Sequence, residues 1–464
     1  MADVVVCGGS VIGLSTAMLL TRDGHRVTVL ERDTAPPPSA ADAWDQWPRP
    51  GVGQFQQPHV LHPRFRLILE DELPEMVRRL SAAGCIEVDW IQLLPPLVRD
   101  RSPREGDDRF RSITGRRPIV EAVFAGAAVD EGIDIRRGVS VAGLLTGPSV
   151  LAGAPHVIGV RTTAGDELRA DLVVDAMGRR TKLAEWLAGA GGRPPHTESE
   201  ECGFVYHSRY YRGPDLPSFT GPPIAGLGTI SVLTIPADNG VWSVTVWAAS
   251  SDTALRNLRH ADRFEAVVRA CPLQAPWLDG EPVSDVITTA GVLDRYRRFV
   301  VDGQPVATGV AAVGDAWACT NPSAGRGVTV GLLHAQRLRD TVRTGIDDPE
   351  RFVRAWDDAT ERDVAPFYWS QIAADRARVA EMDALRRGDE PPPPDADAKA
   401  LEAAMLRDPD VFRGLLEITG CLALPDDVFA RPGFRDKVQA HARARTWAAP
   451  GPDREALLQL VAGA

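Results

Sequence analysis

The N-terminal sequence MADVVVCGGSVIGLSTAMLLTRDGHRVTVLERD contains the pattern that most restricts how this chain can fold. Residues 3–6 (DVVV), in which an apolar run follows Asp3, are typical of a strand buried inside a parallel sheet. Apolar residues then recur at helical spacing over 11–21, and residues 26–30 form a second apolar strand. The three segments predict a β-α-β unit of about 30 residues, with a glycine-rich turn between its first strand and its helix.

The glycine-rich turn predicts a binding site for a dinucleotide. Such a turn lets the backbone approach a pyrophosphate, which the N–H groups at the helix N-terminus bind. Glu31, 18 residues after Gly13, is placed to accept hydrogen bonds from a ribose. Ser10 replaces the middle glycine of the G-x-G-x-x-G fingerprint, and its hydroxyl can donate to a phosphate. The candidate cofactor-binding residues of this unit are Gly8, Gly9, Ser10, Ile12, Gly13, Glu31 and Arg32. A tight turn that binds nothing is the alternative.

Composition excludes several classes of partner. With a net charge of −11, the chain lacks the basic excess of nucleic-acid-binding proteins. Its six cysteines form no C-x-x-C pair and no metal-like spacing, so we expect reduced thiols, no metal site and a cytoplasmic location. No stretch approaches the roughly 18 apolar residues of a membrane span, and the N-terminus lacks the basic start of a signal peptide.

Two distant segments indicate which dinucleotide is bound. Residues 171–182 (DLVVDAMGRRTK) form a buried strand that ends in an acid and a glycine-containing turn. Residues 310–316 (VAAVGDA) form another strand, followed by NPSAGRG at 321–327 and a helix from Val328. Together with the N-terminal turn, these motifs resemble, in order and spacing, those of the flavoprotein monooxygenases related to para-hydroxybenzoate hydroxylase. The resemblance covers about residues 1–345.

The resemblance implies a non-covalently bound FAD and suggests roles for individual residues. Asp315, after Gly314, would be buried beneath the ribityl chain of FAD, whereas Glu31 would lie nearer to solvent. Arg117 would lie close to the flavin, although a solvated start of a helix is the alternative for it. A strand over residues 139–141, which ends at Val141, would bind the adenine. The flavin ring would develop negative charge. It would face the backbone of five residues near the helix N-terminus: Pro322, Gly325, Arg326, Gly327 and Val328.

A long loop and a turn narrow the resemblance to one subgroup. Residues 44–59 (WDQWPRPGVGQFQQPH) resemble a loop that passes beside the flavin in actinobacterial polyether epoxidases and related oxygenases. That subgroup also ends its second motif with a Gly-Arg-x-Ser/Thr turn and a Trp-Leu helix, as at 178–181 and 186–187. Because loops of this length are usually functional or disordered, we interpret this one as functional.

The patterns predict an α/β fold in three parts. A Rossmann-like FAD-binding domain would comprise residues 1–80, 110–200 and 290–345. Alternating side chains between 202 and 296 predict an antiparallel sheet, so residues 81–109 and 201–289 would form an inserted substrate domain. Residues 346–464 would be a helical C-terminal region that covers the pocket or forms a subunit interface. Its apolar periodicity runs over 347–382 and resumes over 398–422, on either side of a proline run.

The function implied by the resemblance is that of a monooxygenase. Reduced FAD would react with O2 to give a flavin C4a-hydroperoxide, and one oxygen atom would enter a hydrophobic, electron-rich secondary metabolite by aromatic hydroxylation or alkene epoxidation. Because the chain has no second glycine fingerprint, NADPH or NADH would bind transiently, or a separate flavin reductase would supply the electrons. The sequence identifies no catalytic acid or base.

Three other functions are alternatives at this point. An FAD-dependent reductase of double bonds, of the geranylgeranyl reductase type, also uses the first and third motifs. A flavin-dependent halogenase shares the fold, but it needs a lysine and a Trp-x-Trp-x-x-Ile element; the chain has no such element and no lysine before Lys182. A non-catalytic FAD-binding protein is the third. The sequence specifies neither the substrate nor the oligomeric state.

Overall fold

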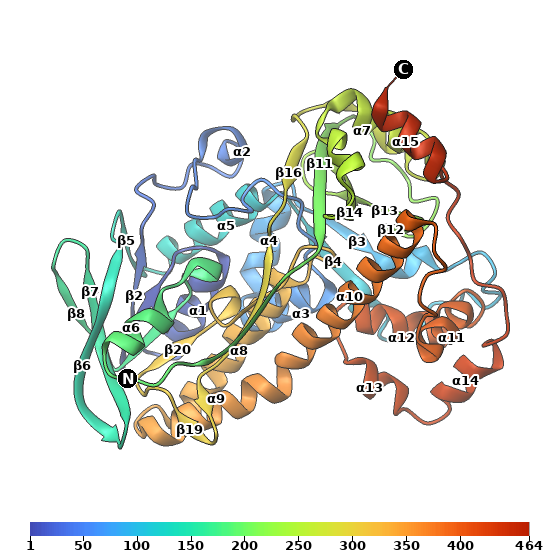
Figure 1. Ribbon diagram of the computed structural model, residues 1–464. Coiled ribbons are helices and arrows are strands. Elements are labelled where there is room, and N and C mark those ends of the chain that lie inside the picture. Colours follow the sequence, from blue (N-terminus) through green and yellow to red (C-terminus); the bar gives the residue numbers. More distant parts are fainter. Residues whose placement is uncertain (464) are drawn as a thin grey trace.

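A parallel sheet forms the centre of the protein in a computed structural model that describes residues 1–463. Its strand order is β20-β9-β1-β2-β5, and helices α1, α5 and α8 lie beside it (Figure 1). The strands are β1 (Asp3–Cys7), β2 (Arg26–Glu31), β5 (Asp134–Arg137), β9 (Leu172–Asp175) and β20 (Val310–Ala312), and the helices are α1 (Val11–Arg22), α5 (Arg117–Asp130) and α8 (Gly327–Gly345). The predicted β-α-β unit is confirmed. Because the strands are parallel, the turns after β1, β9 and β20 meet at one edge of the sheet.

A separate three-stranded antiparallel sheet follows β5. It consists of β6 (Val141–Leu151), β7 (Ala154–Thr162) and β8 (Glu167–Arg169). The prediction of a strand over residues 139–141 is wrong, because Gly138 adopts φ +74° and ends the extended run of β5. Val139 and Ser140 instead connect β5 to β6, and Val139 donates its N–H to the carbonyl of Glu31 at 3.0 Å.

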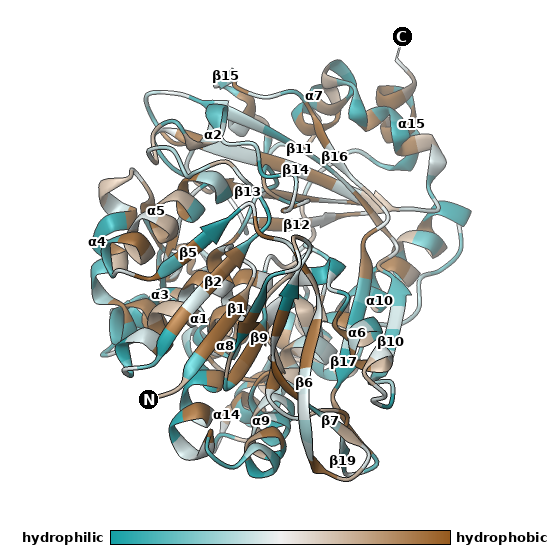
Figure 2. Cartoon of the chain, turned by 90° about the vertical axis from the view of Figure 1, so that its left-hand side faces the viewer, coloured by the Kyte–Doolittle hydropathy of each residue, from teal (hydrophilic) through white to brown (hydrophobic). Residues whose placement is uncertain are grey.

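The middle of the chain folds into a larger antiparallel sheet, as its alternating pattern predicts. The strands are β11 (Phe204–Arg212), β12 (Ile224–Leu227), β13 (Ile230–Pro236), β14 (Val241–Ala249), β15 (Glu281–Pro282) and β16 (Ile287–Thr289). Figure 2 shows this sheet above the parallel one, with apolar residues along β1 and β9. Helices α7 (Ala261–Arg269) and α15 (Arg454–Ala462) pack on one of its faces. Its other face packs against Val60, which directly follows the long loop of residues 44–59, and against Met382 of a C-terminal helix.

Smaller elements connect these two sheets. A third antiparallel sheet contains β10 (His196–Glu201), β17 (Leu293–Arg298) and β21 (Ala318–Cys319). There are also two short two-stranded sheets. One pairs β3 (Ile86–Asp89) with β4 (Arg111–Thr114), and the other pairs β18 (Val300–Val301) with β19 (Gln304–Pro305). The remaining helices before residue 345 are α2 (Ala43–Gln46), α3 (Pro63–Glu72), α4 (Pro74–Ala82) and α6 (Leu183–Gly189).

The C-terminal region is helical, but each predicted helical stretch is divided in two. The helices are α9 (Pro349–Asp363), α10 (Ala365–Arg387), α11 (Ala396–Met405), α12 (Pro409–Thr419), α13 (Pro425–Phe429) and α14 (Phe434–Ala440). Pro366, in the first turn of α10, lacks the N–H that would continue α9. Asp408 caps α12 by accepting from the N–H groups of Asp410 and Val411, which starts a new helix there. None of the helices within residues 1–463 is long and apolar enough to cross a membrane.

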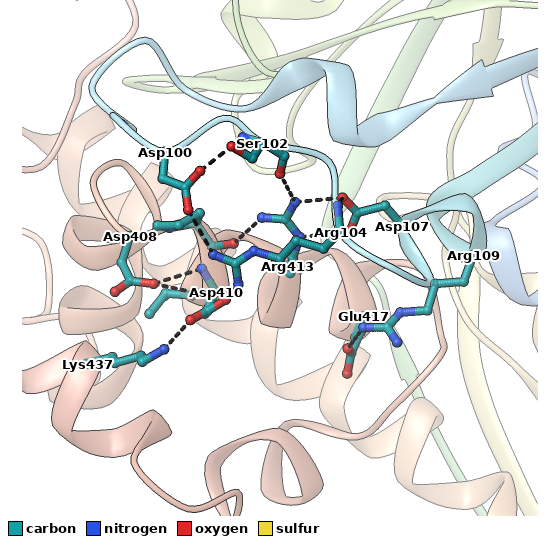
Figure 3. A network of polar contacts seen from close by, with 12 residues as sticks. Asp100, Ser102, Arg104, Asp107, Arg109, Asp408, Asp410, Arg413, Glu417 and Lys437 are labelled. Carbon is teal, nitrogen blue, oxygen red and sulfur yellow. Dashed lines mark hydrogen bonds and ion pairs between the residues drawn. The ribbon is translucent and has the colours of Figure 1, made fainter.

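Helix α12 is joined to the segment around residues 100–109 by ion pairs that we call the C-terminal network. Figure 3 shows Arg413 of α12 between Ser102 and Asp107, and Asp410 between Arg104 and Lys437. Arg413 donates to both carboxylate oxygens of Asp107, at 2.7 and 2.6 Å. The network therefore fastens the C-terminal helices to a segment that lies more than 300 residues earlier in the chain.

Candidate functional site

The glycines of the N-terminal turn allow three segments to pack closely. Gly8 has φ +115°, and a Cβ atom there would lie 2.4 Å from the carbonyl oxygen of Ala176, in the turn after β9. A Cβ atom on Gly13 would lie 1.8 Å from the carbonyl oxygen of Gly8. Any side chain at either position would push the start of α1 away from the sheet edge. The first and second motifs are therefore in direct backbone contact.

The N-terminus of α1 has no side-chain cap. Ser10 occupies the cap position, but its hydroxyl donates to Glu121 at 2.5 Å and accepts from Arg117 at 2.8 Å. The N–H groups of residues 11–13 precede the first intrahelical bond, which runs from Leu14 to Ser10. Three backbone donors and the positive end of a helix dipole thus stand at the predicted pyrophosphate position.

Glu31 lies in a different environment from the one expected. It is 4% exposed, so the expectation that it lies near solvent is wrong. One carboxylate oxygen accepts from the N–H of Asp33 at 2.8 Å, and the other accepts from the N–H of Gly9 at 3.0 Å and from Arg49 at 2.7 Å. A carboxylate has about four acceptor positions, so its capacity for a ribose hydroxyl is small. Arg32, in contrast, is exposed and donates to the carbonyl of Gly51 at 3.0 Å.

Arg49 explains the burial of Glu31. Its side chain is 1% exposed and pairs with Glu31, Asp33 and Glu121 at 2.7, 2.9 and 2.9 Å. Its guanidinium also lies over the ring of Trp47, 4.9 Å from the centroid. We call the group Arg49, Glu31, Asp33, Glu121 and Arg117 the Arg49 cluster. Sequence reasoning missed Arg49, although its position between Pro48 and Pro50, close to Trp44 and Trp47, in a loop that we interpret as functional, is a usable signal.

A second arginine near this cluster was also missed. Arg137 is paired in register with Glu31 at the ends of β5 and β2. Both terminal nitrogens of its guanidinium are buried and have no hydrogen-bond partner among the described residues. Burial and the nearby Arg49 lower its pKa. Val141, predicted to contact the adenine, is half-buried at the start of β6, where it pairs with Thr162.

Arg117 connects the cluster to the long loop. Its Nε donates to Glu121 at 2.6 Å, and its Nη1 lies 3.3 Å from Nε2 of His59. His59 Nδ1 lies 2.8 Å from the carbonyl of Gln57, so Nδ1 is the donor and Nε2 the acceptor. Burial and Arg117 together lower the pKa of His59 to about 3, which keeps the ring neutral. Arg117 itself is 6% exposed, and this burial excludes the alternative of a solvated helix start.

The third motif packs directly on the first. The side chain of Ile12 fits against Gly314 and Gly331, where added Cβ atoms would lie 3.3 and 2.8 Å from it. Gly314 donates its N–H to Nδ1 of His334 at 3.2 Å. Burial raises the pKa of the neighbouring Asp315 carboxyl, and the nearby positive charges of Arg117 and Arg179 oppose this shift. A desolvated carboxylate near the first motif has the chemistry needed to bind ribityl hydroxyls.

The loop between β21 and α8 carries the residues predicted to face the flavin. Gly325 has φ +65°, and a Cβ atom there would lie 2.9 Å from Val60, which directly follows the long loop. Gly327 and Val328 begin α8, which has no side-chain cap at its N-terminus. The side chain of Arg326 contacts Ser370 of α10 and the carbonyl of Ile418 of α12, at 3.3 and 3.4 Å. Arg326 thus binds the C-terminal helices, and only its backbone belongs to the start of α8.

The side chain of Asp175 stabilises the turn of the second motif. Asp175 accepts from the hydroxyl of Thr181 at 2.5 Å and from the N–H of Met177 at 3.0 Å. Burial raises the pKa of Asp175 to about 6, against these hydrogen bonds. Arg179 lies beside Gly53, where an added Cβ atom would be 2.7 Å from its guanidinium. The turn therefore borders the long loop as well as the first motif.

These residues fit FAD. The open donors at the start of α1 suit a pyrophosphate, Asp315 suits the ribityl hydroxyls, and the uncapped start of α8 suits an electron-rich ring edge. The three predicted motifs are brought together at one sheet edge by the contacts of Gly8 with Ala176 and of Ile12 with Gly314. Within residues 1–463 no group of three or more histidine, cysteine or acidic side chains is arranged to hold a metal ion.

Comparisons with known proteins agree with this geometry. Residues 3–112 match the family model of the FAD dependent oxidoreductases. Protein Rv3254 of Mycobacterium tuberculosis is 26% identical over 373 residues, covering 73% of this chain and 72% of that protein.

Three solved structures share the fold at low sequence identity. The Diels-Alderase PyrE3 of pyrroindomycin biosynthesis has a TM-score of 0.61 at 16% identity, covering 90% of this chain and 80% of that one. The myxobacterial chondrochloren halogenase CndH has 0.60 at 18%, covering 99% and 95%. The anhydrotetracycline hydroxylase OxyS of Streptomyces rimosus has 0.55 at 18%, covering 91% and 76%. The chain is therefore an enzyme with an FAD-dependent oxidoreductase domain.

Proposed function

We propose that this enzyme is an FAD-dependent monooxygenase that inserts one oxygen atom of O2 into a hydrophobic, electron-rich substrate. The observation that carries the proposal is the contact between the larger antiparallel sheet and the third motif. The hydroxyl of Tyr206, on β11, donates to Asn321 at 2.8 Å, in the loop that leads to α8. This contact sets a sheet face directly against the loop predicted to border the flavin.

The sheet face next to this loop suits an apolar substrate. Cross-strand pairs place Tyr206 beside Trp247, Ser208 beside Thr245 and Tyr210 beside Ser243 on one face. The hydroxyls of Ser208 and Thr245 are bonded to each other at 2.9 Å, while those of Tyr210 and Ser243 are buried without a partner in the described chain. An apolar surface with a few unpaired polar groups is typical of small-molecule sites.

Bound FAD would supply the electrons and the activation of O2 for such a reaction. The contribution of the chain is to exclude water and to orient the substrate. The aromatic and aliphatic residues of this face are at most 8% exposed, so little solvent reaches it: Phe204, Tyr206, Leu233, Ile235 and Trp247. NADPH or NADH would bind transiently near the second motif, or a separate flavin reductase would supply reduced flavin.

The shared fold also permits other reactions, since a halogenase and a Diels-Alderase have it. The absence of any lysine before Lys182 argues against the halogenase alternative, because that chemistry needs a lysine near the flavin. The resemblance of residues 44–59 to the loop of polyether epoxidases favours alkenes over aromatic rings as substrates.

The test is product formation under 18O2. A panel of aromatic and polyene metabolites is incubated with the FAD-loaded enzyme and a reductant, and products are analysed by mass spectrometry. We expect one 18O atom in the product and oxygen consumption in step with it. Unlabelled product with a reduced double bond would establish the reductase alternative, and unlabelled cyclised product without oxygen consumption would establish a reaction of the Diels-Alderase type.

A further inference from the structure

Asn321 is held by three different parts of the chain. Its backbone N–H donates to Asp294 of β17 at 2.6 Å, and its side-chain nitrogen donates to Asp375 of α10 at 2.7 Å. Its side-chain oxygen accepts from the hydroxyl of Tyr206 of β11 at 2.8 Å. All four side chains are at most 6% exposed. The conformation of the loop after β21 is thus fixed from several sides.

Asp375 binds this loop at a second residue. Its other carboxylate oxygen accepts from the hydroxyl of Ser323 at 2.6 Å. Gln371, one turn earlier on α10, donates to both Ser323 and Asp375, at 2.6 and 2.7 Å. The N–H of Ser323 in turn donates to the side-chain oxygen of Asn321 at 2.9 Å. Asp375 therefore holds residues 321 and 323 together, immediately before Gly325 and the start of α8.

The arrangement is electrostatically costly. No arginine or lysine of the described chain forms an ion pair with Asp294 or Asp375, and Arg326 acts on Asp375 only from a distance. Burial raises the pKa of both carboxyls, that of Asp294 to about 6, and the negative charge of Asp375 adds to the rise in the pKa of Asp294. Apolar side chains can fasten a helix to a loop without this desolvation cost. This cost favours a role for Asp375 beyond packing.

We propose that Asp375 is a positioning residue of the flavin site, which fixes the loop at the start of α8 through Asn321 and Ser323. This inference rests on the proposed function for the identity of the ligand. It makes α10 part of the cofactor site, although the helix lies in the C-terminal region, outside the three motifs. The third motif and α10 line the same small cavity, whose walls include Asp315, Gly327, Tyr368 and Gln371.

The test compares Asp375→Asn with Asp383→Asn in the full-length protein. Asp383 lies on the same helix and bonds Ser251 at the surface, so it is a matched control. Apo-protein is titrated with FAD, and the visible absorption spectrum of the bound flavin is recorded. We expect Asp375→Asn to bind FAD about tenfold more weakly, since it loses a bond to a charged acceptor, and to shift the flavin spectrum. Asp383→Asn should match the wild type in both.

Each outcome decides between a positioning role and a structural one. An Asp375→Asn protein that is less stable in urea but has the wild-type flavin spectrum and affinity would overturn the proposal. If that variant does not fold, Ser323→Ala removes one bond of the same set, and an unchanged spectrum and affinity there would overturn it as well. Failure of the wild type to bind FAD would overturn both proposals, whereas binding without oxygen insertion would remove only the proposed reaction.

Discussion

The Arg49 cluster and the C-terminal network are built from the same chemical groups but differ in burial. In the Arg49 cluster, the arginine is 1% exposed and its three carboxylates are at most 7% exposed. In the C-terminal network, exposure rises from 7% at Arg413 to 36% at Arg104 and 44% at Lys437. Burying ionised groups is costly, so the two networks serve different purposes.

Their positions show what the difference means. The Arg49 cluster lies at the carboxyl edge of the parallel sheet, beside the uncapped N-terminus of α1 and the unpaired donors of Arg137. The C-terminal network lies between α12, α14 and the segment around Asp107, and its charges are paired with one another. Buried charge next to open donors indicates a ligand site, whereas half-exposed, paired charge indicates a fastening between segments.

Arg49→Met should give the largest effect. It leaves Glu31, Asp33 and Glu121 buried without their shared cation, which costs about 3–5 kcal/mol of unfolding free energy. Urea unfolding of the apo-protein measures this loss of unfolding free energy. The control is Arg104→Met, which removes a half-exposed ion pair and should lose less than about 1 kcal/mol. Equal losses in the two variants would remove the distinction between the networks.

The third motif, at the same sheet edge as the Arg49 cluster, and the C-terminal network should also respond differently to pH. Burial lowers the pKa of His334, which supports Gly314, to about 3, while its unfolded value is near 6.5. Below pH 6.5 the unfolded chain therefore binds a proton at this histidine that the folded chain does not, and His334 alone lowers stability by about 2 kcal/mol between pH 7 and pH 5.

In the C-terminal network, Arg413 holds the pKa of Asp107 below its usual value. That stabilisation persists at pH 5 and is lost only as the pH falls through the lowered pKa. Urea unfolding of His334→Gln at pH 7 and pH 5 tests the contribution of His334. The decrease in stability of this variant should be about 2 kcal/mol smaller than that of the wild type, because other buried histidines such as His59 still contribute. A decrease as large as that of the wild type would contradict it.

Arg413→Met should have an intermediate effect. Arg413 is more buried than the rest of the C-terminal network and makes two bonds to Asp107, so we expect a loss of about 1–2 kcal/mol. Hydrogen exchange of the α12 amides should rise while that of β1 is unchanged, because only the fastening of the C-terminal helices is weakened. Increased exchange in β1 would show that the two regions are coupled.

The smallest expected effect is that of salt. At about 1 M NaCl the Debye length is about 3 Å, so the half-exposed pairs of Arg104 and Lys437 are screened. The stability difference between Arg104→Met and the wild type should vanish, while that of Arg49→Met should persist. A salt-sensitive Arg49 effect would indicate that the cluster is solvated.

Local patterns in the sequence predicted much of the fold. The β-α-β unit, the strands of the second and third motifs and the antiparallel middle sheet all follow from periodicity and glycine placement. The strand over 139–141 failed because a single residue, Gly138, has a positive φ that periodicity does not reveal. The break between α9 and α10 could have been predicted, because Pro366 lies inside the apolar pattern.

The site was predicted less completely, because its contacts join distant residues. Arg49 meets Glu121, 72 positions later, and Asn321 meets Asp375, 54 positions later. No spacing rule links such pairs in a single sequence. The burial of Glu31 follows from Arg49, so the expectation of a solvent-near Glu31 failed for the same reason.

The most direct test of the central claim, that the three motifs form one non-covalent FAD site, is a titration of the apo-protein with FAD followed by flavin fluorescence. The wild type should bind a single FAD per chain and release all of it on denaturation. Asp315→Ala should bind FAD about 5- to 150-fold more weakly, because it leaves ligand hydroxyls unpaired, while its apo-protein remains as stable as the wild type. No FAD binding, flavin that stays attached after denaturation, or an unchanged affinity of Asp315→Ala would contradict the account.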